Sequence, residues 1–211
     1  MNASKIVTLI VTSLMLFIRS AVGSIQTPYE TYRRLAKGEH LLQAAPIFLI
    51  SFAYFGWSSL VHHGVTANPY LLTVSFSKLV FGFLGGFGMI ILSLILIGKL
   101  VGGVGDLRKV FLPLSYSLLP TIIWFFATSI MSLVFPPPRT ISFPGQLFSF
   151  IFLSFSLFLF FWKSILYYLT LRFSMRLDMG KIFTASLILF PLGALYALVM
   201  YRMGIFRVPF I

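Results

Sequence analysis

Five apolar stretches of about twenty residues or more occupy most of this chain and restrict its fold more than any other feature. They are Leu41–Val61, Leu71–Ile97, Val110–Val134, Leu147–Thr170 and Ile182–Met203. About 20 helical residues cross the hydrocarbon core of a bilayer, where only helices and closed barrels satisfy all their backbone groups. Charged residues make up 9% of the chain, against about 25% in soluble domains. The pattern predicts an all-α, polytopic transmembrane helical bundle with five spans.

The segments between these stretches are too short to fold as separate domains. The sequence therefore predicts one five-span domain over residues 25–211, preceded by an N-terminal hydrophobic helix over residues 1–24. Pro113 and Pro120 interrupt the third stretch, and Pro191 lies in the fifth. Prolines are tolerated inside membrane helices because neighbouring groups satisfy the carbonyls that they free.

The N-terminal apolar run over residues 6–18 is shorter than an ordinary span. Three interpretations stay open for it. It is an interfacial helix, since Lys5, Thr8 and Thr12 fall on one helical face; or it is a short sixth span; or it is a signal peptide cleaved after Ala21-Val22-Gly23. Cleavage would invert every later loop, against the charge distribution.

Basic residues gather on one side of the predicted bundle. In a five-span topology, segments 19–40, 98–110 and 170–181 share one side and hold ten Lys and Arg, against three on the other side. This bias follows the positive-inside rule. We therefore expect these three segments in the cytoplasm, the C-terminus outside, and a multi-pass location in the plasma (inner) membrane of a prokaryote. The net charge of +12 then indicates contact with the lipid bilayer rather than with nucleic acid.

The sequence carries no recognisable catalytic or metal-binding motif. It has no cysteine, and its four acidic residues all lie outside the apolar stretches. The H-E-x-x-H, G-x-S-x-G and Walker patterns are all absent. We expect no enzymatic activity, no catalytic residue, no cofactor and no bound metal.

Two lysines lie within apolar sequence, Lys78 in the second stretch and Lys163 in the fourth. Either can extend its ammonium group toward the head groups while its stem stays in lipid. The other interpretation is a contact with an anionic lipid or ligand, for which Lys163 is the candidate intramembrane residue.

Gly82 and Gly86 form a small-xxx-small pair in the second stretch. Such pairs let two helices approach closely. The pair predicts tight helix packing, either within the chain or between copies of it.

Three segments occur in an order that resembles a known family. Pro28-Tyr29-Glu30-Thr31-Tyr32 is similar to the P-x-E-T-[FY] segment of the Yip1-domain family of membrane proteins. The stretch from Lys99 to Pro120 resembles that family's "GG-x-G … YALLP" feature, with Ser117 where Ala is usual and Asp106 where Ser or Thr is frequent. Phe161-Trp162-Lys163 resembles its tryptophan-bearing fourth span. The likeness covers about residues 25–205, and the compact form resembles prokaryotic members.

The resemblance implies a five-span bundle without known enzymatic activity, in some members linked to ABC-type exporters. We therefore expect an accessory or scaffold subunit of a membrane complex, with other membrane subunits or copies of itself as partners. A transporter or lipid-handling protein is the alternative. The expected docking face lies on the cytoplasmic side and comprises Arg33, Arg34, Gly102, Gly103, Asp106, Arg108 and Lys109.

Overall fold

The computed structural model describes residues 3–63, 68–134 and 143–205, and all regular elements in these ranges are helices. They are α1 (Ala3–Gln26), α2 (Pro28–Leu35), the short 3-10 helix η1 (Leu41–Ala44), α3 (Ala45–His63), α4 (Pro69–Leu100), α5 (Leu107–Tyr116), α6 (Leu119–Val134), α7 (Phe143–Ser174) and α8 (Met179–Arg202). The predicted all-α architecture is confirmed.

Within the described ranges, six segments are long and apolar enough to cross a membrane. Five of them correspond to the predicted spans. The sixth, Lys5–Gln26, lies in α1. This helix is longer than the apolar run over residues 6–18 because it continues through Arg19 and Ser20 to Gln26.

Prolines and polar caps fix where several helices begin. Pro28 and Pro69 lie in the first turns of α2 and α4, where a missing N–H is harmless because it would have no partner inside the helix. At the start of α4, the Asn68 side chain accepts a hydrogen bond of 3.0 Å from the backbone N–H of Tyr70. This bond satisfies one of the free donors of the first turn.

The third predicted span divides into α5 and α6. Helix α5 ends at Tyr116 and α6 begins at Leu119, because Pro120 cannot donate to the carbonyl of Tyr116 and its ring would clash with that carbonyl. By contrast, Pro113 lies inside α5 without ending it. The predicted interruption is therefore a full helix break at one of the two prolines.

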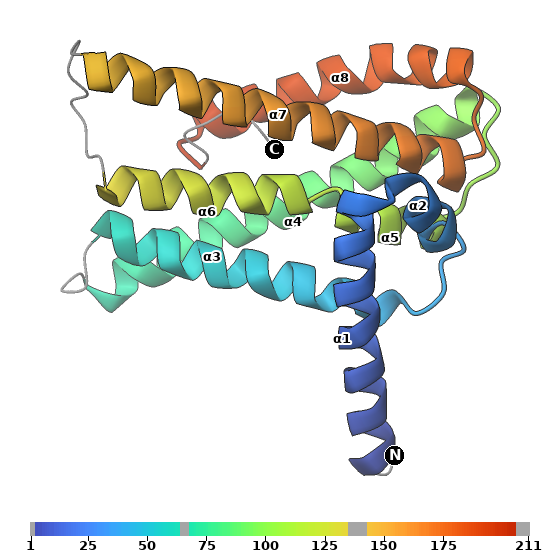
Figure 1. The fold of residues 1–211 in the computed structure, drawn as a ribbon, viewed down its shortest axis with the longest axis horizontal. Helices are drawn as coiled ribbons and strands as arrows, with labels where there is room; N and C mark the ends of the chain where they lie inside the picture. Colours follow the sequence, from blue (N-terminus) through green and yellow to red (C-terminus); the bar gives the residue numbers. More distant parts are fainter. Residues whose placement is uncertain (1–2, 64–67, 135–142, 206–211) are drawn as a thin grey trace.

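Helix α1 differs from the other long helices in direction. Figure 1 shows it crossing the axes of α3, α4, α6, α7 and α8, which run roughly parallel or antiparallel to one another. Only its C-terminal part meets the bundle, where Phe17 and Ala21 pack against the core. Most apolar side chains of α1 are exposed, including Val7, Ile10 and Met15.

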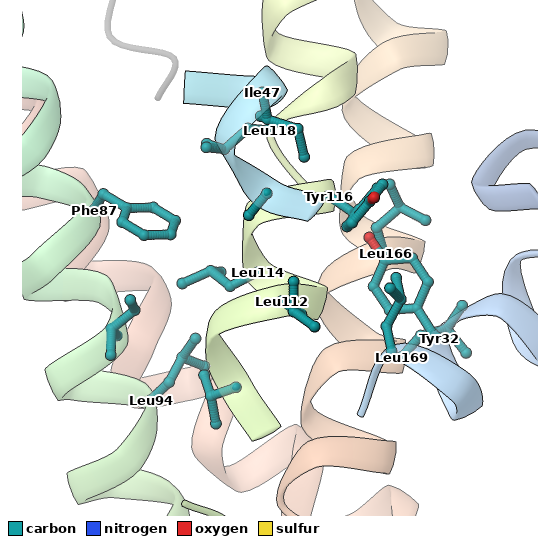
Figure 2. Close-up of a cluster of buried hydrophobic side chains, with 14 of the residues drawn as sticks. Tyr32, Ile47, Phe87, Leu94, Leu112, Leu114, Tyr116, Leu118, Leu166 and Leu169 are labelled. Carbon is teal, nitrogen blue, oxygen red and sulfur yellow. The ribbon is translucent and has the colours of Figure 1, made fainter. Parts of the chain in front are cut away.

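One end of the bundle carries most of the charged residues, and we call it the basic end: residues 28–44, 99–109 and 172–181. Here α5 is enclosed by α2, η1, α4 and α7. Its side chains Leu112, Leu114 and Tyr116 are almost completely buried and meet residues from the surrounding helices in a continuous apolar cluster (Figure 2). The packed core of the protein therefore lies toward the basic end.

Candidate functional site

A glycine-containing loop between α4 and α5 is fixed against the end of α7. The backbone N–H of Val104 donates to the carbonyl of Met175 at 3.0 Å, and that of Gly103 donates to Gly98 at 2.7 Å. A Cβ atom on Gly105 would lie 2.2 Å from Sδ of Met175 and 2.5 Å from the carbonyl oxygen of Ser174. The absence of a side chain at Gly105 is therefore what lets the loop reach α7.

The connection after α2 approaches the start of α5 in the same way. Gly38 has a φ of 73°, in the left-handed region that favours glycine. A Cβ atom there would lie 2.9 Å from the carbonyl oxygen of Arg108. These close approaches hold α2, residues 101–106 and α5 together.

The predicted docking residues all lie at the basic end, but they differ in accessibility. The exposed ones are Arg33, Gly102, Asp106 and Arg108. The partly buried ones are Arg34, Gly103 and Lys109. One of these, Arg34, donates through Nη2 to the hydroxyl of Ser20 in α1 at 3.4 Å. The exposed group can touch a partner, whereas Arg34 and Gly103 make contacts within the chain.

A buried polar network, which the sequence analysis did not predict, lies beside Arg34. Gln43 is 5% exposed, and its Oε1 accepts hydrogen bonds from Ser20 and Tyr116, each at 3.4 Å. Its Nε2 donates to the carbonyl of Glu39 at 3.2 Å. The network ties α1, η1 and α5 together. Its signal in the sequence is a glutamine just inside an otherwise apolar stretch.

Tyr32 lies at the centre of the same end with no exposed surface. Its hydroxyl is buried and has no hydrogen-bond partner among the described residues. Burial raises the pKa of Tyr32 well above its usual range, with smaller contributions from Tyr167 and Tyr116. The hydroxyl therefore stays neutral through the physiological pH range.

Lys163 lies on the face of α7 that packs against α6. Its Nζ donates to Oγ1 of Thr121 at 2.7 Å and lies 5.7 Å from the centroid of the Tyr167 ring. Further along the same two helices, Nε1 of Trp124 donates to the hydroxyl of Ser156 at 2.9 Å. Lys163 therefore belongs to a polar seam between α6 and α7, defined by Thr121, Trp124, Ser156, Lys163 and Tyr167.

The neighbouring Trp162 links this seam to α1. Its Nε1 donates to the backbone carbonyl of Ser24 at 3.3 Å. Since Ser24 lies near the end of α1, the crossing helix meets α7 at the level of Lys163.

The predicted packing glycines face α8 within the same chain. The Tyr196 hydroxyl donates to the carbonyl of Gly82, and a Cβ atom on Gly86 would lie 2.7 Å from that hydroxyl. A groove of about 470 Å³ continues from this contact and is lined by Ser77, Lys78, Phe81 and Met200 among others. The exposed Lys78 lies at this groove, away from the seam of Lys163.

The described ranges contain no group of three or more His, Asp or Glu side chains that could hold a metal ion. What the geometry offers is a charged surface at the basic end and a lone ammonium group on α7. The fold and these features define a polytopic helical membrane protein.

A comparison with known families identifies the family of this membrane protein. The Yip1 domain matches residues 22–201, which is nearly the whole chain. The chain belongs to the Yip1-domain family, and the resemblance seen in the sequence is confirmed. No curated protein and no solved structure matches it.

Proposed function

We propose that this protein is a non-enzymatic accessory or scaffold subunit of a membrane complex in a prokaryotic plasma membrane. Its docking surface is the exposed part of the basic end. The observation that carries the proposal is the close packing of the backbone segments at this end. The close approaches at Gly38 and Gly105 hold the charged segments in fixed relative positions.

The chemistry of this surface suits a protein partner. Arg33, Arg108 and the acidic Asp106 are exposed at this end, and further exposed cations there are Lys37, Lys99, Arg176 and Lys181. Mixed fixed charges favour specific partners and accelerate association. An ABC-type exporter is the partner class that the family resemblance suggests.

The test is recovery of the complex in native-lipid nanodiscs, with quantitative mass spectrometry of the proteins that copurify. We expect one stoichiometric membrane partner, and we expect the Arg33→Ala/Arg108→Ala variant to lose it. Neutralisation is preferable to charge reversal because the topological bias falls only from ten against three to eight against three basic residues. Lys78→Ala is the matched control, since it removes an exposed cation from α4 far from this end. A monomer without any partner, or unchanged recovery in the double variant, would contradict the proposal.

A second candidate function is transport or lipid handling. It is supported by the break between α5 and α6 next to a helix pair that carries Lys163, because interrupted membrane helices often form transport sites. Reconstituted vesicles should then show lipid or solute movement that Lys163→Ala abolishes. Vesicles that are silent with both proteins would argue against this candidate.

A further inference from the structure

We propose that Lys163 and Thr121 form a binding site for the phosphate group of an anionic phospholipid, at the level where α1 crosses the bundle. The site is independent of the docking surface at the basic end. For the second candidate function it names the ligand class. The site is tested by equilibrium binding without any transport step. A failure to bind the lipid and a failure to transport are therefore separate results.

The first argument is the unmatched charge of Lys163. Its ammonium group has three N–H donors, and within the described residues Thr121 is its one hydrogen-bond acceptor. The chain's four carboxylates lie at positions 30, 39, 106 and 178, all at the basic end and outside the seam. A cation among apolar helices is costly without an anionic or strongly polar partner. The charge of Lys163 therefore has no anionic partner among the described residues.

The second argument is the depth of the site. The apolar stretch Leu147–Thr170 ends seven residues after Lys163, which is about 10 Å of helix. A lysine this close to the end of a span can extend its ammonium group to the level of the lipid phosphates.

Helix α1 marks the same level independently. It crosses the spanning helices (Figure 1) and is joined to α7 by the hydrogen bond between Trp162 and the Ser24 carbonyl. A helix that crosses the bundle lies along the membrane surface when the bundle spans the membrane. Tryptophan is also enriched at this depth. Both observations place Lys163 at the head groups.

The third argument selects a lipid over a free anion. Phe160 precedes Lys163 by three residues and lies on the same side of α7, where it is 41% exposed. This apolar surface suits an acyl chain, while Lys163 and the hydroxyl of Thr121 can both donate to phosphate oxygens. In the structure the Thr121 hydroxyl accepts from Lys163.

The experiment counts lipids that remain bound to the protein after release from nanodiscs containing phosphatidylglycerol and phosphatidylcholine in equal amounts, by native mass spectrometry. We expect one retained phosphatidylglycerol, with affinity about tenfold lower in Lys163→Met, as for loss of a charged hydrogen bond. Lys163→Arg should bind nearly as well as the parent. Lys78→Met is the matched control and should leave binding unchanged, and excess inorganic phosphate should not displace the lipid.

Three results would overturn the site: equal retention of the two lipids, full retention in Lys163→Met, or displacement by inorganic phosphate. If Lys163→Met does not fold, quenching by brominated lipids decides the question. In a Trp57→Phe variant the remaining tryptophans, Trp124 and Trp162, lie on the seam or next to it. Stronger quenching by brominated phosphatidylglycerol than by brominated phosphatidylcholine supports the site, and equal quenching overturns it.

Discussion

At the residue scale, the basic end combines close packing with two buried hydroxyls, those of Tyr32 and Ser174, that have no hydrogen-bond partner among the described residues. Tyr32 is completely buried, yet its hydroxyl has no partner among the described residues. A buried hydroxyl without a hydrogen bond is unfavourable, whereas the aromatic ring contributes through burial. The ring and the hydroxyl of Tyr32 therefore have opposite effects on stability.

We expect Tyr32→Phe to be as stable as the parent or more stable, and Tyr32→Ala to be destabilised by about 3–5 kcal/mol. Thermal unfolding in detergent, followed by tryptophan fluorescence, measures both. Tyr29→Phe is the control, since Tyr29 is 52% exposed. A clear loss of stability in Tyr32→Phe would show that the hydroxyl has a partner.

The pKa of Tyr32 adds a pH dependence to this comparison. Because burial raises this pKa, the neutral form is favoured in the folded state. Its contribution to stability is complete below the unfolded pKa of about 10 and falls as the pH rises above that value. The stability of Tyr32→Phe relative to the parent should therefore increase at alkaline pH and stay constant between neutrality and pH of about 9.

A second prediction at this scale concerns Gly105. Alanine there would place its Cβ against Met175 and the backbone of Ser174, so we expect Gly105→Ala to lose about 2 kcal/mol or more. Gly180 in α8 has nothing within 4 Å of the same position. We expect Gly180→Ala to be neutral or up to about 1 kcal/mol more stable. Equal unfolding temperatures of the two variants would argue against the close contact.

At the element scale, the direction of α1 bears on two of the three interpretations of the N-terminal segment, the interfacial helix and the sixth span. Helix α1 crosses the other long helices (Figure 1), so α1 and the bundle cannot both run along the membrane normal. Its length of 24 residues alone would suffice for a span. Orientation, rather than length, therefore favours the interfacial interpretation.

Cysteine scanning along α1 tests this directly, because the chain has no cysteine of its own. We expect single cysteines at Lys5, Thr8 and Thr12 to react with a water-soluble maleimide, and those at Ile10 and Leu14 on the opposite face to be protected by lipid. Reactivity should thus repeat with the helical period. A protected centre between reactive ends would instead indicate a span, and a missing N-terminus in mature protein would indicate cleavage.

At the scale of the whole molecule, the structure collects the basic segments at one end of the bundle. The segments predicted to share a membrane side are distant in sequence but adjacent in the fold, as the contacts of α2 with α5 and α7 show. The excess of basic residues at this end, ten against three on the other predicted side, fits a single orientation under the positive-inside rule.

We expect the basic end in the cytoplasm. Met179→Cys at the basic end and Tyr70→Cys at the start of α4 both replace exposed, uncharged side chains, so neither alters the charge bias. An impermeant reagent should label Tyr70→Cys in intact cells and Met179→Cys only after permeabilisation. The reverse labelling would invert the topology and place the proposed docking surface outside.

The sequence by itself determined the class of fold. An apolar run of span length satisfies its backbone hydrogen bonds in lipid when it folds as a helix. The distribution of Lys and Arg correctly predicted which loops lie together at one end. Pro120 predicted an interruption, because its effect on the preceding turn is local. These features depend on neighbours in sequence, so they can be read from it.

Only the tertiary structure decided which distant residues meet. Thr121 and Lys163, or Gly105 and Met175, come together because of how helices pack, which periodicity does not encode. The same holds for the direction of α1, which depends on the contacts of Ser20 and Ser24 with Gln43 and Trp162. Apolarity specifies that a helix belongs in the membrane, whereas packing and a few polar contacts specify how it lies there.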